Sequence, residues 1–324
     1  MKAAQIQSYG GSEVIEINSD TSKPEIKNEQ ILVEVDSASL NPIDYKVRLG
    51  YLKEMVPLNF PSTLGGDFAG VIQEVAPDVT DFKTGDLVFG QAIVLNGGSG
   101  SLAEFAAANI KNIALKPQTL DFIQAAGLPL VGTSALQAIE EHLKVSKDQK
   151  ILIHGGAGGI GSIAIQLAKM QGAYVITTVS KDQIDFVKQL GADEIIDYKS
   201  QDFSEIVKDL DGVFDTVGGD VANKSLDVLK KGGIFVSMVA QIPPEQALQK
   251  GVTAISQNTS TTSKKLERLA ELIDSGKIKV LIDKVFSLEQ VKEAFDYLEH
   301  SHPKGKVVVK IKSEHSRDSS TDSQ

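Results

Sequence analysis

The segment that most constrains the fold is ILIHGGAGGIGSIAIQLAK, residues 151–169. An apolar stretch typical of a buried strand runs into a glycine-rich turn, and the turn leads directly into a helix pattern. The spacing predicts one apolar helix face that contains Ile160, Ile163, Ala164, Leu167 and Ala168. A strand, a glycine turn and a helix in this order predict a dinucleotide-binding unit. The alternative is a structural turn that binds no ligand.

The glycines of this turn have different expected roles. Gly155 or Gly156 can make the tight turn, whereas Gly158 and Gly159 allow backbone N–H groups to approach a pyrophosphate. Gly161 lets the helix pack closely on the strand. The N-terminus of the helix adds a partial positive charge that favours an anion.

The type of nicotinamide cofactor depends on the residues that follow the second strand. NAD-binding proteins usually carry an acidic residue there, whereas this chain has Ser180 and Lys181 at the end of AYVITTVS. A hydroxyl and an ammonium group would hold a 2'-phosphate, so we expect NADPH, with Tyr198 as a further phosphate contact. Asp182 weakens this argument unless it caps the next helix. Tyr198 has the alternative role of a packed aromatic residue.

The rest of the chain predicts two domains, because 324 residues exceed what one core usually supports. Residues 1 to about 120 contain short strand-like runs, and after Lys150 strands alternate with helices, which favours a parallel, doubly wound sheet. Ser287 to Gln290 forms a capping box, and the helix that follows is expected to bury Leu288, Val291, Ala294, Phe295 and Leu298. The polar tail, residues 313–324, is expected to be disordered.

Composition excludes several kinds of site and partner. The chain has no cysteine, which rules out disulfides and thiolate zinc ligands, and its five histidines show no metal-ligand spacing. A net charge of -10 with scattered basic residues disfavours nucleic acid as a partner. No signal-peptide pattern and no apolar run near the roughly 18 residues of a membrane span are present, so we expect a cytoplasmic protein without membrane association.

Together these segments resemble the medium-chain dehydrogenase/reductase superfamily, in its zinc-independent quinone oxidoreductase and enone reductase branch. The resemblance extends over about residues 1 to 311 and includes the motifs NPID (41–44), GGDFAG (65–70), KTGDLV (83–88), GSLAEFAAA (100–108), GTSA (132–135), FDTVGG (214–219) and GKVV (305–308). It implies an α/β fold with a GroES-like β-barrel catalytic domain, residues 1–120 and 285–312, and a Rossmann domain, residues 121–284. It also implies a homodimer, in which the edge strand near residues 252–257 would pair.

The resemblance also implies positions for the cofactor and the substrate. In relatives, the cofactor phosphates meet the backbone at Gly158, Gly159 and Ile160, and the 2'-phosphate meets positions that match Ser180 and Tyr198. Thr133 is expected near the nicotinamide, with helix capping as its alternative role.

The substrate site is expected around the NPID motif. Asn41 is the first candidate for orienting the substrate or the nicotinamide ribose, followed by Asp44 and Lys46. Tyr51 is a candidate for lining the pocket, and the sequence does not rank it above Tyr45 or Tyr9. Local turn chemistry is the alternative for all three residues of this group, Asn41, Asp44 and Lys46. Asp67 stands where zinc relatives carry a metal-linked pair, and we expect it to act as a structural hydrogen-bond acceptor.

Three hypotheses for the function follow. The first is an NADPH-dependent reductase of quinones or α,β-unsaturated carbonyl compounds, whose conjugated acceptors need only hydrogen-bond donors to stabilise the developing oxyanion. The second is a metal-free reductase of another activated alkene. The third is an NADPH-binding protein with a structural or sensing role, as in crystallins of this family.

Overall fold

The computed structural model describes residues 1–312, and the chain divides into two compact units. The first unit contains residues 1–130, residues 261–274 and the segment that begins at Ile282. The second unit contains residues 131–260 and 275–281. The boundaries expected from the sequence assign residues 121–130 and 261–274 to the Rossmann domain, whereas these segments pack with the first unit. The expected disorder of the tail concerns residues outside the described range.

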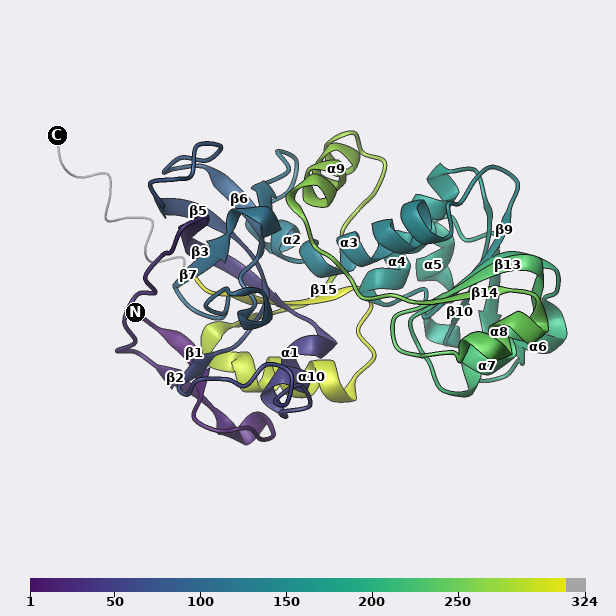
Figure 1. The fold of residues 1–324 in the computed structure, drawn as a ribbon, viewed down its shortest axis with the longest axis horizontal. Helices are drawn as coiled ribbons and strands as arrows, with labels where there is room; N and C mark the ends of the chain where they lie inside the picture. Colours follow the sequence, from purple (N-terminus) through teal and green to yellow (C-terminus); the bar gives the residue numbers. More distant parts are fainter. Residues whose placement is uncertain (313–324) are drawn as a thin grey trace. The chain divides into compact units, whose positions relative to one another are not determined.

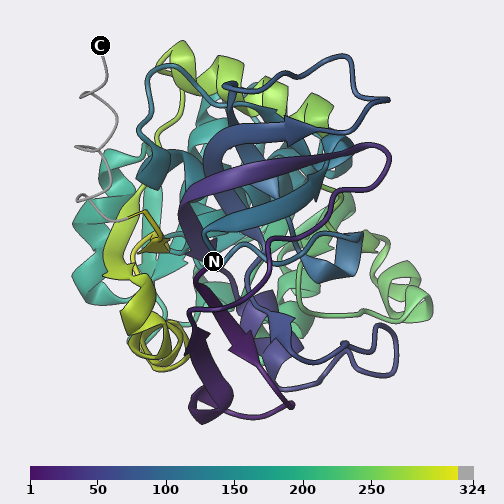
Figure 2. The same ribbon diagram turned by 90° about the vertical axis from the view of Figure 1, so that its left-hand side faces the viewer.

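The first unit is built around a seven-stranded sheet in the order β15-β16-β3-β5-β6-β8, with β7 also paired to β3. Its strands are β3 (Gln30–Leu40), β5 (Asp67–Val75), β6 (Leu87–Gln91), β7 (Phe105–Asn109), β8 (Ile113–Leu115), β15 (Ile282–Ser287) and β16 (Lys306–Lys310). Figure 2 shows beside it, in dark purple, part of a smaller sheet of β1 (Ala3–Ile6), β2 (Ile15–Asn18) and β4 (Ser62–Thr63).

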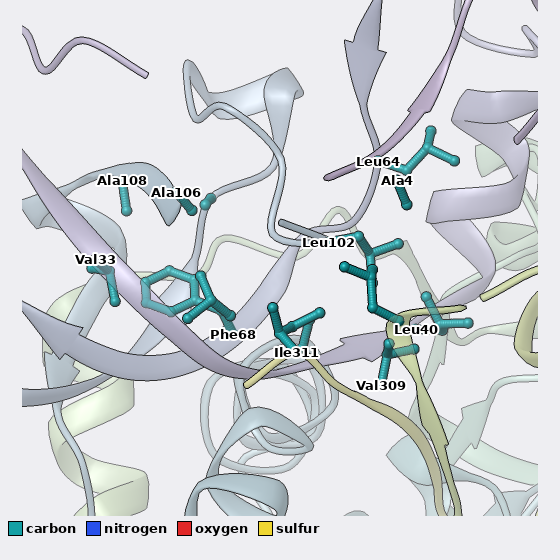
Figure 3. Packing of buried hydrophobic residues seen from close by; sticks show 14 of the residues in the cluster. Ala4, Val33, Leu40, Leu64, Phe68, Leu102, Ala106, Ala108, Val309 and Ile311 are labelled. Carbon is teal, nitrogen blue, oxygen red and sulfur yellow. The ribbon is translucent and has the colours of Figure 1, made fainter. Parts of the chain in front are cut away.

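The core of the first unit lies among these strands. Figure 3 shows part of it, with Val33, Phe68 and Val309 contributed by three different strands. Complete burial of a side chain such as Phe68 stabilises the fold by about 1.5–3 kcal/mol. Within the described residues, this unit contains the helices α1 (Pro42–Arg48), α2 (Phe122–Ala126), α9 (Ser263–Asp274) and α10 (Val291–His300). The capping box is confirmed, because the Ser287 N–H donates to Gln290 Oε1 at 3.1 Å, and the side chains expected to face inward join this core.

The second unit contains a six-stranded parallel sheet in the order β11-β10-β9-β12-β13-β14 (Figure 1). Its strands are β9 (Lys150–His154), β10 (Tyr174–Val179), β11 (Glu194–Asp197), β12 (Leu210–Asp215), β13 (Leu229–Ser237) and β14 (Thr253–Ser256). This is the Rossmann strand order, and the direction of succession reverses between β9 and β12. The predicted doubly wound sheet is confirmed.

Helices cover both faces of this sheet. α6 (Phe203–Ile206), α7 (Asp220–Asp227) and α8 (Pro244–Lys250) pack on one face, in a core that includes Leu152 and Phe235. α4 (Gly159–Met170) buries Ile163 and Leu167 against the opposite face, and α5 (Ile184–Gln189) follows β10. Before β9, α3 (Pro129–Leu136) continues into a π-helical segment, Gln137–His142.

Candidate active site

The glycine turn between β9 and α4 has the geometry that its sequence predicts. Gly155 adopts a φ of 73°, which supplies the tight turn at little steric cost. A Cβ at Gly156 would lie 2.0 Å from Thr177 Oγ1, and one at Gly161 would lie 2.2 Å from the Gly155 carbonyl oxygen. Both positions therefore require glycine, because the helix begins in direct contact with the sheet.

The N-terminus of α4 offers backbone donors to an anion. Gly158 is the N-cap residue with extended backbone, no side chain caps the helix, and its first turn contains no acidic residue. Gly158, Gly159 and Ile160 are partly exposed. A Cβ at Gly158 would approach only the Gly155 carbonyl oxygen, at 3.4 Å. The N–H groups and the helix dipole thus favour a phosphate at this end of the twelve-residue helix.

Two residues expected to hold the 2'-phosphate lie at the carboxyl ends of adjacent strands. Ser180 follows β10 and Tyr198 follows β11, and the Tyr198 N–H donates to the Val179 carbonyl oxygen at 3.2 Å. The Ser180 hydroxyl donates to Asp182 Oδ1 at 2.6 Å, so it is already paired with a carboxylate. Lys181 and Tyr198 are exposed, and both side chains can reach a ligand at this edge.

The alternative role of Thr133, capping of a helix, requires a position just before the helix begins. The structure places Thr133 elsewhere. α3 already begins at Pro129, so the whole GTSA motif is inside the helix and Thr133 is fully buried. Pro129 explains the earlier start, because proline is favoured in the first turn of a helix. An N-capping role for Thr133 is therefore wrong.

A second group of polar residues is buried in the first unit, centred on Asp67 at the start of β5. Asp67 Oδ2 accepts from Asn41 Nδ2 at 2.9 Å and from the Leu130 N–H at 3.1 Å, and Oδ1 accepts from Gln91 Nε2 at 2.8 Å. The sheet register explains the Gln91 contact, because Asp67 on β5 lies opposite Gln91 on β6, with Ser39 of β3 on its other side. Asp67 thus has the acceptor role expected from the sequence.

Asn41 connects Asp67 to a buried lysine. Lys306 Nζ donates to Asn41 Oδ1 at 2.5 Å and to the Leu40 carbonyl oxygen at 2.7 Å. Asn41 precedes Pro42 and is extended, and its backbone N–H donates to Asp44 Oδ2 at 2.7 Å. We call Asn41, Asp44, Asp67, Gln91 and Lys306 the buried polar network.

Burial perturbs the charged members of this network. Desolvation raises the pKa of Asp44 from 3.8 to about 7, with an opposing contribution from the Asn41 N–H. Burial also raises the pKa of Asp67, against the attraction of Lys306 and the hydrogen bonds from Gln91 and Asn41. Burial lowers the pKa of Lys306, while Asp67 and Asp44 oppose that shift. Ionisable groups with such environments are typical of functional sites.

Three other polar residues lie outside the buried polar network. Lys46 is on α1 with a partly buried side chain, and Tyr51 follows the helix with 71% of its surface exposed. His154, at the end of β9, contacts Thr178 Oγ1 through Nδ1 at 3.0 Å and Ser225 Oγ through Nε2 at 3.1 Å. Desolvation lowers the pKa of His154 to about 4, which is consistent with a neutral, hydrogen-bonded packing residue.

Sequence reasoning missed Gln91 and Lys306. Lys306 opens the apolar run KVVV, and a lysine at the start of a strand is normally exposed. Its one signal is the GKVV motif, in which the lysine is followed directly by the apolar residues of a buried strand. Gln91 carries no signal of its own, because only the pairing of β5 with β6 brings it to Asp67.

Comparison with known proteins places both units in one family. A family model described as "Alcohol dehydrogenase GroES-like domain" matches residues 27–118, and one described as "Zinc-binding dehydrogenase" matches residues 190–309. The chain is 39% identical, over 95% of its length and 79% of the relative's, to a chloroplastic NADPH-dependent alkenal/one oxidoreductase of Arabidopsis thaliana. No group of three His, Cys, Asp or Glu side chains within residues 1–312 is arranged to hold a metal ion.

Two solved structures have the same fold over nearly the whole chain. A quinone oxidoreductase from Coxiella burnetii has 39% identity and a TM-score of 0.89, with 96% of this chain and 99% of that chain covered. The Escherichia coli quinone oxidoreductase, solved in complex with NADPH, has 27% identity and a TM-score of 0.86, with 96% and 100% covered. This chain belongs to the medium-chain dehydrogenase/reductase superfamily, in the branch of the quinone and alkenal/one oxidoreductases.

Proposed function

We propose that this protein transfers a hydride from NADPH to a quinone or an α,β-unsaturated carbonyl compound. The binding of NADPH is supported mainly by the glycine turn between β9 and α4. β9 lies where the strand order of the Rossmann sheet reverses, and α4 has no side-chain cap and no acidic residue in its first turn. The acceptor class rests on the similarity to an alkenal/one oxidoreductase and to quinone oxidoreductases.

The residues present fit a dinucleotide. Gly158, Gly159 and Ile160 would give backbone N–H groups to its pyrophosphate, and the close fit at Gly156 and Gly161 holds these donors in place. When bound, the nicotinamide supplies the hydride, and the chain orients it and excludes competing reactions. Thr133 stays a proposed nicotinamide contact.

The preference for the phosphorylated cofactor rests on Ser180, Lys181 and Tyr198. Lys181 and Tyr198 are exposed at the strand ends, where an ammonium and a phenol can bind a phosphate. Asp182 opposes this preference, because its carboxylate accepts the Ser180 hydroxyl hydrogen. Lys181 therefore carries most of the proposed selectivity, and comparison of NADPH with NADH tests it.

For the substrate, Asn41 is the leading candidate among the side chains named from the sequence. Both polar ends of its amide are hydrogen-bonded within the buried polar network, so it acts as part of that network. Lys46 and Tyr51 stay candidates for contacts at a more exposed position. A conjugated acceptor is already electrophilic, so hydrogen-bond donors suffice to stabilise the anion that hydride addition produces.

The proposal includes a homodimer and a cytoplasmic location. β14 ends the Rossmann sheet and pairs only with β13 within the described residues, so its other edge can pair with a second copy. The Arabidopsis thaliana relative is named as chloroplastic. No helix within residues 1–312 is long and apolar enough to cross a membrane.

NADPH oxidation with a panel of quinones, enones and other activated alkenes tests the proposal. Turnover of quinones or enones supports it, and turnover restricted to another alkene class favours the second hypothesis. Tight NADPH binding without turnover of any acceptor would refute it and favour the structural or sensing role. Elemental analysis of the active protein, with stoichiometric zinc as the adverse result, tests the zinc-independent part.

A further inference from the structure

A small cavity adjoins Asp44 in the first unit. It offers about 10 Å³ to the centre of a water molecule, and its lining includes Ser62, Thr63 and Gly65 as polar neighbours and Val47 and Ile93 as apolar ones. This volume suits a single water molecule, which needs two to four polar partners. Asp44 is 2% exposed and belongs to the lining of this cavity.

The two carboxyl groups of the buried polar network have different neighbours. Asp67 is surrounded by donors, since Asn41 Nδ2, Gln91 Nε2 and the Leu130 N–H all point at its oxygens. A hydrogen on Oδ2 of Asp67 would face two of these donors. Asp44 has one such partner, the Asn41 N–H on Oδ2, and no donor within residues 1–312 contacts its Oδ1.

The charges of the network do not balance when both carboxyl groups are ionised. Asp44 and Asp67 then carry two negative charges, and Lys306 supplies one positive charge in a site with almost no solvent. An unpaired buried charge is strongly unfavourable, so one additional proton stabilises the network. The donors around Asp67 leave Asp44 as the place for that proton.

We propose that Asp44 holds a proton at neutral pH and exchanges it through a water molecule bound in the adjoining cavity, which makes Asp44 the proton reservoir of the reduction. This inference rests on the proposed function. Hydride addition to an enone leaves an enolate, which must gain one proton to become the saturated ketone. The Asp44 O–H bond breaks, water passes the proton on, a C–H bond forms on the enolate carbon, and solvent then restores the proton to the carboxylate.

The electrostatic surroundings agree with this assignment. Burial raises the pKa of Asp44 to about 7, the Asn41 N–H opposes the shift, Asp67 adds to it, and Lys306 opposes it. These groups belong to the N-cap of α1 (Asn41), to β5 (Asp67) and to β16 (Lys306). A carboxyl group with a pKa near the working pH is suited to proton transfer.

Infrared spectroscopy of the protein without cofactor tests the protonation directly. The C=O band of a protonated carboxyl group should be present below neutral pH and disappear with a midpoint near pH 7. Asp44→Asn should abolish this band at pH 6, where ordinary exposed carboxyl groups are ionised. Asp36→Asn is the matched control, because Asp36 is also buried in the first unit but is paired with Lys310 at 2.5 Å, and this variant should keep the band. A band that persists in Asp44→Asn would overturn the assignment.

A high-resolution crystal structure of the unaltered protein gives a test that needs no variant. It should show two unequal C–O bonds in Asp44 and a water molecule within hydrogen-bonding distance of Oδ1. Equal C–O bonds together with an empty cavity would overturn the proposal.

Kinetics test the role in turnover. With an enone, kcat/KM should fall about tenfold for each pH unit above the Asp44 midpoint, because the protonated form is the active one. Asp44→Asn should lose this pH dependence and be slower at pH 6, whereas Asp36→Asn should keep it. An unchanged profile in Asp44→Asn would refute the reservoir role. If the unaltered protein reduces no acceptor, the proposed function fails, while the infrared and crystallographic results still decide whether Asp44 holds the proton.

Discussion

Replacement of Lys306 by methionine should destabilise the first unit strongly and in a pH-dependent way. The side chain is 4% exposed, donates to Asn41 Oδ1 and the Leu40 carbonyl oxygen, and is attracted by the buried carboxyl groups of Asp44 and Asp67. Methionine keeps the apolar stem of the side chain but leaves the negative charge of the buried carboxyl groups uncompensated. Loss of one partner from a buried ion pair costs about 3–5 kcal/mol, and we expect this loss at pH 8.

The pH dependence follows from proton linkage. Without Lys306, the folded-state pKa values of Asp44 and Asp67 rise further above the unfolded value of 3.8. A carboxyl group with a raised folded pKa takes up a proton in the folded state as the pH falls, so the variant recovers stability at low pH. The deficit relative to the unaltered protein should therefore be smaller at pH 5 than at pH 8, by at least about 1 kcal/mol.

Urea unfolding at pH 5 and pH 8 measures both quantities, with Lys310→Met as the control. Lys310 is on the same strand and pairs with Asp36, but a quarter of its side chain is exposed (25%), so its replacement should cost about 1–2 kcal/mol. Equal losses for the two variants, or an identical Lys306→Met deficit at both pH values, would show that the network is not a compensated charge cluster.

The other predictions concern the second unit. Gly161→Ala should lower the free energy of unfolding by about 1–3 kcal/mol, because the new Cβ would lie 2.2 Å from the Gly155 carbonyl oxygen. Gly158→Ala is the control: its Cβ would lie 3.4 Å from the same oxygen, so thermal unfolding should show a change of less than about 1 kcal/mol. The pKa of His154 is about 4 in the folded state and 6.5 in the unfolded state. Between about pH 6.5 and pH 4 the folded state therefore binds fewer protons, and the free energy of unfolding decreases as the pH falls through this range. His154→Gln should remove up to about 3 kcal/mol of that change, and a similar pH curve in the variant would contradict the assignment. Lys181→Glu should raise the KM for NADPH roughly fivefold to tenfold and leave that for NADH nearly unchanged, and equal effects on both cofactors would refute its phosphate role.

The Rossmann sheet and its glycine turn could be predicted because their determinants are local. Each strand and helix has its own apolar pattern, and Gly155 and Gly161 are separated by a few residues of one turn. Helix capping by Thr133 was the wrong alternative, because α3 begins at Pro129 and contains the whole GTSA motif.

The buried polar network could be predicted only in part, because its members are distant in the sequence. Asn41 and Lys306 are 265 positions apart, and only the pairing of β16 with β3 brings them together. The sequence named Asn41 and Asp44 and gave Asp67 an acceptor role, but the GKVV motif alone did not indicate that its lysine joins them. The pairing of Ser180 with Asp182 was a similar case, since two neighbouring polar residues do not reveal which of them faces a ligand.

The most direct test of the proposed function is the transfer of deuterium from NADPH labelled at the reactive position of its nicotinamide ring. The protein, treated with a chelator, should convert an enone to a saturated ketone that carries one deuterium on the β-carbon, with a proton from solvent on the α-carbon. Turnover only after zinc is added, or no deuterium in the product despite tight NADPH binding, would contradict zinc-independent hydride transfer.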